Sequence, residues 1–272
     1  MKKTGKALAL VLCFCFVMGM AVQAKEIPET GTDYSPVFNA QYYYQAYPDL
    51  QTAVGNDPQQ LLQHFVTSGM KEGRVGSAEF NVRDYMANNV DLIPVLGTKN
   101  LSAYYYHYIQ SGKAEGRIAV SQDRNADVLA SFSTKYNTEE DRAVNVALAS
   151  DRINGIVVQP GDRFSFSGSV LSRTVENGYV LAPSIASGRM VTSVGGGICQ
   201  VSSTLYVAMV LASLPATEHH SHSLQVDYVP LGLDAAIVEG AKDLRFQNSY
   251  DFPVRIDSTV EDGTLTVSIC KA

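Results

Sequence analysis

The sequence predicts an α+β protein: a smaller all-α repeat module followed by a C-terminal domain of mixed helices and antiparallel strands. Three observations lead to this prediction. An internal repeat with apolar residues at helical spacing occupies residues 36–118, strand-like segments dominate from Leu224 onward, and alternating apolar residues close the chain in a hairpin around Asp262-Gly263. A chain of 272 residues is long enough for two packed units of this kind.

The first 24 residues have the composition of a secretory signal peptide. Three lysines precede an apolar run, and small residues end it at Ala24. The run is shorter than the roughly 20 residues that a membrane-spanning helix needs. We therefore expect a secreted or cell-wall-associated bacterial protein that meets the membrane only through residues 1–24, with a linker at residues 25–35.

Loss of this segment would change the charge and the cysteine content. It removes three lysines and no acid, which leaves 18 basic and 27 acidic residues and a net charge of −9. This charge argues against a nucleic-acid partner. Two cysteines remain, Cys199 and Cys270, so at most one disulfide can form.

An internal repeat defines the N-terminal module at residues 36–118. Phe38 and Phe80 occupy equivalent places 42 residues apart, whereas the later motifs HFVTSGMKEGR and HYIQSGKAEGR are 43 residues apart, which indicates a one-residue insertion. Two copies are few for a solenoid, so we expect a compact helical module.

Each copy carries signals for the start and the end of a helix. The predicted N-cap and glycine stop are Asp57 and Gly69 in the first copy, and Ser102 and Gly112 in the second. His64 and His107 occupy equivalent places on these helices. Because they recur in both copies, packing is a better explanation for them than catalysis.

A polar linker at residues 119–128 separates the module from a second domain at residues 129–272. A helix is expected there, with Thr138 as its N-cap and Asn154-Gly155 as its stop. Further strands are expected around the turn at Pro160-Gly161 and in the segments LQVDYV (224–229), AAIV (235–238) and DLRFQN (243–248).

The stretch SVGGGICQVSSTLY, residues 193–206, places a cysteine between a glycine-rich turn and a helical pattern. At the first turn of a helix, the unpaired N–H groups and the positive end of the helix dipole favour the thiolate form of Cys199. Amides of the glycine loop, at Gly196 and Gly197, are candidates to hold an oxyanion. Two other interpretations stay open: a disulfide with Cys270 and an inert buried thiol.

A cysteine nucleophile needs a base, and histidines follow it by 20 to 23 residues: His219, His220 and His222. On a strand, His220 and His222 would share one face. Asp234 or Asp243 could then orient the ring of the base. A metal site formed by Glu218 and these histidines is the competing interpretation, but no third ligand occurs at standard spacing, so neither a metal nor a cofactor is expected.

Five blocks follow one another between Leu129 and Ile256: RAVNVALASDRINGIVVQPGDRFSF, GGGICQVSSTLY, EHHSHS, DYVPLGLDAAIV and KDLRFQNSYDFPVRI. In this order they resemble the signature blocks of the VanW-like domain family, which is named for an accessory gene product of vancomycin-resistance clusters. The preceding repeats resemble a loosely defined repeat of bacterial surface and secreted proteins. Some VanW-like domains are L,D-transpeptidases, which cross-link peptidoglycan through a cysteine.

The resemblance implies that Cys199 attacks the carbonyl that precedes the terminal D-alanine of a peptidoglycan stem peptide, and that an amine on a neighbouring strand takes the thioester. His222 matches the last histidine of the family's histidine block and is the first choice of base, with His220 second and Asp234 as the orienting acid. Candidate contacts to the substrate complete the predicted site: Arg189, Gln200, Ser202 and Ser203.

Leu233 departs from the family pattern, in which many relatives have a polar or basic residue, and a contact of this side chain with substrate would alter specificity. Two alternatives to an L,D-transpeptidase remain. The same site would also suit a peptidoglycan peptidase, and a structural Cys199 would suit a non-catalytic wall-binding surface protein. In each case the repeats would dock to a cell-wall polymer or a surface protein.

Overall fold

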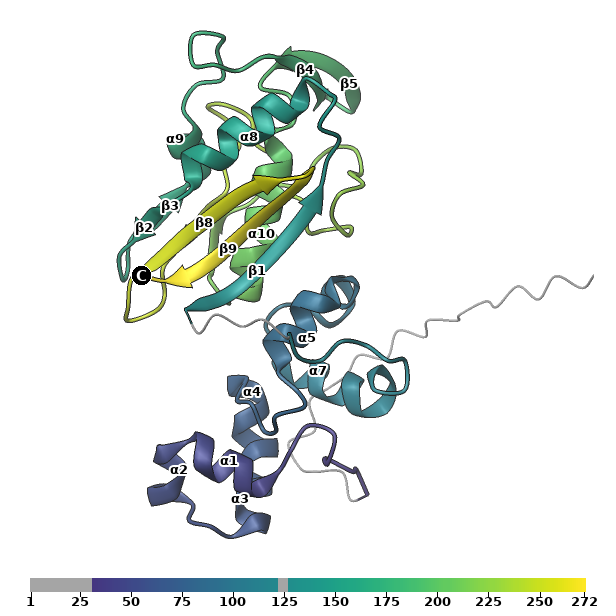
Figure 1. The fold of residues 1–272 in the computed structure, drawn as a ribbon, viewed down its shortest axis with the longest axis vertical. Helices are drawn as coiled ribbons and strands as arrows, with labels where there is room; N and C mark the ends of the chain where they lie inside the picture. The colour runs from purple at the N-terminus through teal and green to yellow at the C-terminus, as the bar shows by residue number, and fades with distance from the viewer. Residues whose placement is uncertain (1–30, 122–126) are drawn as a thin grey trace, which may run out of the picture.

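A computed structural model describes residues 31–121 and 127–272 of the chain. The predicted signal peptide at residues 1–24 lies outside the described residues, as do most of the predicted linker at residues 25–35 and the middle of that at 119–128. The fold is α+β, as the sequence predicts: a helical N-terminal region precedes antiparallel sheets packed against helices (Figure 1).

Short helices build the N-terminal region. They are α1 (Ala40–Ala46), α2 (Pro48–Ala53), α3 (Pro58–His64), α4 (Met70–Glu72), α5 (Val82–Asn88), α6 (Ile93–Leu96) and α7 (Leu101–His107), with a 3-10 turn at Val90–Leu92. Asp57 caps α3 as predicted, because its carboxylate accepts the amides of Gln59 and Gln60. Ser102, predicted as the matching cap, lies inside α7, which begins after Asn100.

The predicted glycine stops are wrong in both copies. Gly69 and Gly112 end π-helical turns, Phe65–Gly69 and Tyr108–Gly112, that continue α3 and α7. The left-handed glycines lie four residues later, at Gly73 and Gly116. Glycine is needed at the earlier positions for space, since an added Cβ would overlap a tyrosine hydroxyl from the first helix of the same copy.

Three antiparallel sheets form the C-terminal region. The largest has the strand order β1-β9-β8-β2: β1 (Val128–Lys135), β9 (Thr264–Lys271), β8 (Val254–Glu261) and β2 (Ile156–Val158). A second has the order β3 (Arg163–Ser165), β7 (Arg245–Gln247) and β6 (Ala216–Glu218), and the third is the hairpin of β4 (Leu181–Ala186) and β5 (Arg189–Val194). Strands β8 and β9 confirm the predicted hairpin, and its turn residues Asp262 and Gly263 both have positive φ.

Helices α8 (Arg142–Ile153) and α10 (Ile198–Leu211) pack on the large sheet and on each other, and α9 (Phe166–Val170) follows β3. Figure 1 shows α10 behind β8, β9 and β1. Helix α8 begins after Asp141 instead of Thr138, and it ends at Asn154-Gly155 as predicted. Twelve of the fourteen residues of α10 are buried, and the exceptions are Cys199 and Tyr206.

The strands predicted at residues 224–229 and 235–238 are absent from the described structure, apart from an isolated bridge between Val238 and Lys242. The reason lies in where the backbone groups bond. The amide of Ala235 donates to the side chain of Ser203 on α10, and that of Ala236 donates to a loop carbonyl. A helix side chain and a loop carbonyl thus take the place of the neighbouring strand that a β-strand at residues 235–238 would need.

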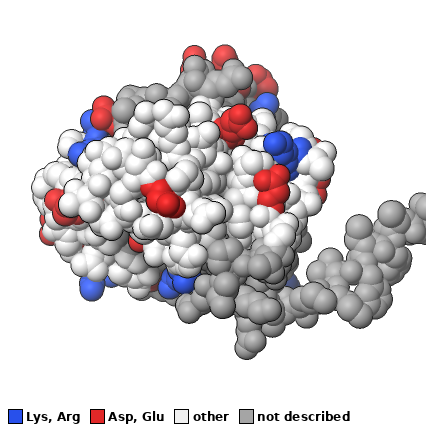
Figure 2. Space-filling view, turned by 90° about the horizontal axis from the view of Figure 1, so that it is seen from below, with Lys and Arg blue, Asp and Glu red and all other residues white. Residues whose placement is uncertain are grey.

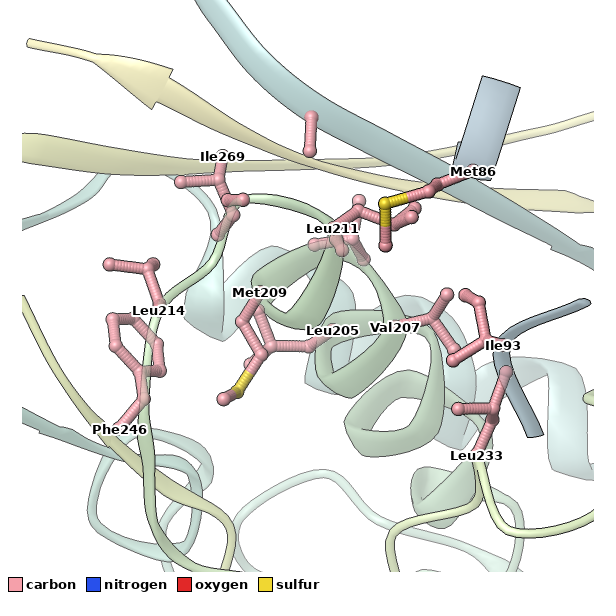
Figure 3. Close-up of a cluster of buried hydrophobic side chains, with 14 of the residues drawn as sticks. Met86, Ile93, Leu205, Val207, Met209, Leu211, Leu214, Leu233, Phe246 and Ile269 are labelled. Atoms are coloured by element: carbon pink, nitrogen blue, oxygen red, sulfur yellow. The ribbon is translucent and has the colours of Figure 1, made fainter. Parts of the chain in front are cut away.

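One hydrophobic cluster runs through both regions of the chain. Figure 3 shows Met86 and Ile93 of the helical region in this cluster together with Leu211 and Val207 of α10. The guanidinium of Arg83 strengthens the junction, because it donates to the carbonyl oxygen of Leu211 at 3.0 Å and to a serine hydroxyl in the next turn at 2.7 Å. The sheet domain and the helices therefore pack as one body at this point.

The surface shows no sorting of charge on the face drawn in Figure 2, where basic and acidic residues lie scattered among uncharged ones. Within residues 31–121 and 127–272, helices long and apolar enough to cross a lipid bilayer do not occur.

Candidate active site

The glycine-rich turn joins strand β5 to helix α10 and leaves no room for side chains. Gly195 and Gly197 have φ values of 82° and 103°, in the left-handed region. A Cβ at Gly196 would collide with the carbonyl of Ala182 in β4. The amide of Gly196 already donates to Ser193 at 3.2 Å, so it is committed inside the turn.

Cys199 is the second residue of α10, so it lies in the first turn of a helix as the sequence predicts, and its thiol is half-buried. The amide of Ile237 points at the sulfur, with an N···Sγ distance of 3.4 Å. The amide of Cys199 belongs to the first helical turn, where helix geometry supplies no acceptor. The N-cap of the helix is Gly197, which supplies no side-chain acceptor, so the amide of Cys199 is a candidate donor to a substrate oxygen beside the thiol.

His222 and Asp234 lie together next to Cys199. One carboxylate oxygen of Asp234, Oδ2, accepts both the backbone amide of His222 at 2.6 Å and its ring Nδ1 at 2.7 Å. Because Nδ1 is engaged, Nε2 is the ring nitrogen left for the thiol of Cys199, with which the side chain of His222 interacts. Burial opposes protonation of His222, but the thiol and the carboxylate outweigh it and raise the pKa of the imidazole above its usual value.

The other two histidines point elsewhere, so the prediction that His220 and His222 share one face is wrong. The ring Nε2 of His220 lies 3.1 Å from a carboxylate oxygen of Glu218. The backbone carbonyl of His220 accepts the amide of Ala236, next to the residue whose amide contacts Cys199. His219 stacks on Tyr206, with ring centroids 4.0 Å apart, and its Nε2 lies 2.7 Å from the carbonyl oxygen of Asp234. His219 thus helps to fix the backbone of Asp234, a role that the sequence did not indicate.

Several residues predicted to touch substrate have their polar groups committed inside the protein. Ser202 donates to the carbonyl of Ala235 at 2.7 Å, and Ser203 donates to that of Cys199 at 2.7 Å. Both serines are fully buried. They tie the segment that carries Asp234 to helix α10, and the structure does not place them toward a substrate.

Four further predictions need correction or narrowing. Gln200 is 1% exposed and its amide is used internally. Arg189 lies exposed on the β4–β5 hairpin and is not among the described residues that line the cleft. Leu233 is buried in the core (Figure 3), which removes it from substrate contact. Asp243, the rival orienting acid, instead accepts bonds from Ser165 and the amide of Ser167.

Cys270 lies on β9 and is buried, and both cysteines of the described residues are free thiols. Burial and the neighbouring Asp257 raise the pKa of Cys270 to about 11, so this thiol is protonated and unreactive at neutral pH. Among the residues that the structure describes, no group of three or more histidine, cysteine and acidic side chains is arranged to hold a metal ion.

A cleft of about 800 Å³ opens over Cys199 and His222. The β4–β5 hairpin forms one wall, and the loop that replaces the predicted strand at residues 224–229 forms another. Sequence reasoning missed several of its polar residues: Arg142, Arg173, Asp227, Tyr228 and Lys242. Arg142, Asp227, Tyr228 and Lys242 stand in blocks that resemble those of the family, but these blocks lie far apart in the chain and their spacing does not show that the side chains meet. Met190 and Val191 of the hairpin add exposed apolar surface to the rim.

Comparison with known proteins finds a family match for the part of the chain that forms this cleft. The pattern of the family described as "VanW like protein" matches residues 141–270. The chain is 39% identical over 142 residues to "Uncharacterized protein YoaR" of Bacillus subtilis (strain 168), which covers 52% of this chain and 47% of that protein. It is 30% identical over 129 residues to "Vancomycin B-type resistance protein VanW" of Enterococcus faecalis (strain ATCC 700802 / V583), covering 46% of this chain and 47% of that protein.

The chain thus spans about half the length of the curated relatives that it matches. No solved structure matches it. The matched segment contains every residue named above that surrounds the thiol, and it leaves the helical repeats outside.

Proposed function

Because the chain belongs to the VanW-like family through residues 141–270, we propose that it is an exported cysteine acyltransferase of peptidoglycan, acting as an L,D-transpeptidase. One observation carries this proposal. Cys199 is the half-buried thiol of a helix in which twelve of fourteen residues are buried, and it lines a cleft next to a histidine that Asp234 orients through Nδ1. A disulfide or an inert buried thiol would need neither the cleft nor the oriented base.

The acylation step follows from this arrangement. Nε2 of His222 takes the proton of the thiol, and the sulfur of Cys199 attacks a peptide carbonyl of the donor. The amide of Cys199 is placed to stabilise the negative oxygen that forms. When the C–N bond breaks, His222 returns the proton to the departing amine of D-alanine, and a thioester remains on the sulfur.

The second step regenerates the thiol. The side-chain amine of a diamino acid on a neighbouring stem peptide attacks the thioester, loses a proton to His222 and forms the new amide bond as the sulfur departs. No nucleotide is consumed, because the energy of the donor's peptide bond is kept in the thioester. This economy suits a protein that works outside the cell, where we propose that residues 1–24 direct it and that the helical repeats hold it to a wall polymer or a surface protein.

The test is to incubate purified stem peptides with the protein and to identify the products by mass spectrometry. We expect cross-linked dimers and free D-alanine, and we expect Cys199→Ala to lower both by at least about 10³-fold. Cys270→Ala is the matched control, because it removes the other described thiol, which is buried on β9, and it should behave as the unaltered protein does.

The products also separate the alternatives. Trimmed monomers without dimers would mean that water takes the thioester and that the protein is a peptidase with the same site. Equal product from the unaltered protein and Cys199→Ala would refute catalysis by this thiol and leave a wall-binding protein.

A further inference from the structure

We propose that Arg142 forms a carboxylate-binding subsite beside Cys199 and that it recognises the free terminal carboxylate of the peptide on which the thiol acts. The identity of that peptide rests on the proposed function, whereas the binding of a carboxylate at Arg142 does not. Gln200 is the positioning residue of this subsite. It acts on the substrate only through the guanidinium that it holds.

Arg142 is the first residue of α8, and its side chain lies against the turn that presents the thiol. A Cβ added at Gly197 would lie 3.1 Å from Cβ of Arg142 and 3.4 Å from its Nε. Arg142 and Cys199 line the same cleft. The guanidinium therefore borders the space in which the scissile bond must lie.

Buried polar groups hold the guanidinium in place. The amide nitrogen of Gln200 donates to the hydroxyl of Thr134 at 3.0 Å and to the carbonyl of Lys135 at 2.9 Å. Its amide oxygen is thereby aimed at Arg142 and accepts from Nη2 at 3.0 Å. The hydroxyl of Thr134 is itself held by Thr204 at 2.9 Å. A fully bonded buried network of this kind fixes one orientation of the group at its end.

The charge of Arg142 has no counterion among the residues that the structure describes. Glu140 and Asp227 also line the cleft, yet neither is paired with it, and the bond to Gln200 is a bond to a neutral group. In addition, Nε is shielded from solvent and has no hydrogen-bond partner. The guanidinium is thus held in the cleft by a neutral group, and its charge is left for an anion that arrives with a ligand.

The second arginine of the cleft is different. Arg173 packs its methylene groups over Gly195 and has its Nε 3.9 Å from a carboxylate oxygen of Glu239. Its charge is therefore partly balanced within the protein. The contrast singles out Arg142 as the cation that awaits an anion, and a planar guanidinium suits the two oxygens of a carboxylate.

The position has a consequence for specificity. In a peptide with a free C-terminus, the terminal carboxylate lies one residue beyond the last scissile carbonyl. A guanidinium next to the thiol would therefore select the last peptide bond of the donor. Peptides that end in an amide, or that continue further, would lose this contact.

Alkylation of Cys199 by two small reagents tests the subsite without any turnover. In both reactions the sulfur forms a bond to the methylene carbon and iodide leaves, but iodoacetate carries a carboxylate and iodoacetamide does not. We expect Arg142→Gln to lower the ratio of the iodoacetate rate to the iodoacetamide rate about tenfold. Arg142→Lys should give an intermediate ratio, and Gln200→Leu should lower it less than Arg142→Gln does.

Two matched controls remove other arginines. Arg173→Gln changes the charge of the same cleft by the same amount, and Arg189→Gln removes the exposed arginine of the hairpin. Both should change the ratio by less than twofold. Equal losses in Arg142→Gln and Arg173→Gln would overturn the proposal, because they would mean that the general field of the cleft attracts the anion.

A binding measurement decides the matter if the thiol reacts with neither reagent. In the Cys199→Ala background, calorimetry should detect a stem peptide with a free carboxylate at least about tenfold more tightly than its C-terminal amide. Arg142→Gln should abolish this difference. A preference that survives Arg142→Gln refutes the subsite, whereas a preference without cross-linking in the product assay refutes only the proposed reaction.

Discussion

Histidines in the helical repeats and in the C-terminal cleft have different partners. In the repeats, His64 lies 3.0 Å from the hydroxyl of Tyr43, and His107 lies 2.8 Å from that of Tyr85. In the cleft, His222 lies 2.7 Å from the carboxylate of Asp234 and beside a thiol. The repeat partners are phenols that stay neutral, whereas the cleft partners carry or develop charge.

Burial and neighbouring charges together set the protonation of His107 and His222. Burial lowers the pKa of His107, and the charges around it do not reverse this effect. Burial acts on His222 in the same direction, but Cys199 and Asp234 reverse it and raise the pKa. The same side chain is thus a neutral packing element in one region and a candidate base in the other. Its partners, more than its burial, decide which role it has.

The largest expected effect comes from removing the ring of His222. We expect His222→Ala to slow alkylation of Cys199 by iodoacetamide at neutral pH about 100-fold, because the thiol loses its base. The rate can be followed by mass spectrometry in a Cys270→Ala background. His107→Ala should leave that rate unchanged and lower the free energy of unfolding by about 1–3 kcal/mol, since the buried Tyr85 loses its partner. A similar fall of the rate in both variants would contradict the division of roles.

Much of the fold was predictable because it follows local periodicity. The closing hairpin and the position of Cys199 at a helix start come from alternation, helical spacing and glycine, which are properties of neighbouring residues. The repeat also predicted which positions in the two copies are equivalent once the one-residue insertion is allowed for. The structure has the same ion pair at those positions in both copies, Arg74 with Asp49 and Arg117 with Asp91.

The remainder depends on tertiary contacts that leave no periodic pattern. The segment from Ala235 to Val238 looks like a strand because it is short and apolar, but its amides bond to side chains of helix α10. The role of Arg142 could not be predicted, because it depends on contacts with Gln200 and Gly197, which are more than fifty residues away in the chain. The pairing of His222 with Asp234 could be predicted, since a cysteine nucleophile needs a base and the base needs a group that orients it.

An intermediate effect is expected from the glycine that packs against a tyrosine hydroxyl in each repeat. We expect Gly112→Ala to destabilise the protein by about 1–3 kcal/mol, because the new methyl group would overlap the hydroxyl of Tyr85. In a Tyr85→Phe background the same change should cost much less, since alanine is otherwise the better helix former. Urea unfolding of the four proteins gives the coupling between the two sites.

Gly69→Ala is the internal control for that cycle, because Tyr43 stands in the same relation to Gly69. It should show the same dependence on a Tyr43→Phe change. Alkylation of Cys199 should be unaltered in all of these variants. A cost that is independent of the tyrosine hydroxyl would show that backbone strain, and not the packing of the pair, requires glycine.

The smallest expected effect is a difference in the sign of a pH dependence. For His222, whose pKa is raised in the folded state from an ordinary value of 6.5, the folded state binds the proton more tightly. Its contribution to stability is fully present below pH 6.5 and is lost as the pH rises through the raised pKa. For His107, whose pKa is lowered, the unfolded state binds the proton more tightly, so stability is lost as the pH falls through 6.5.

Urea unfolding between pH 5 and 9 should therefore show that the difference from His222→Gln shrinks as the pH rises, while the difference from His107→Gln grows. Slopes of the same sign would mean that the two environments do not act oppositely on the ring, and the contrast between a phenol and a carboxylate partner would fail as an explanation of their roles.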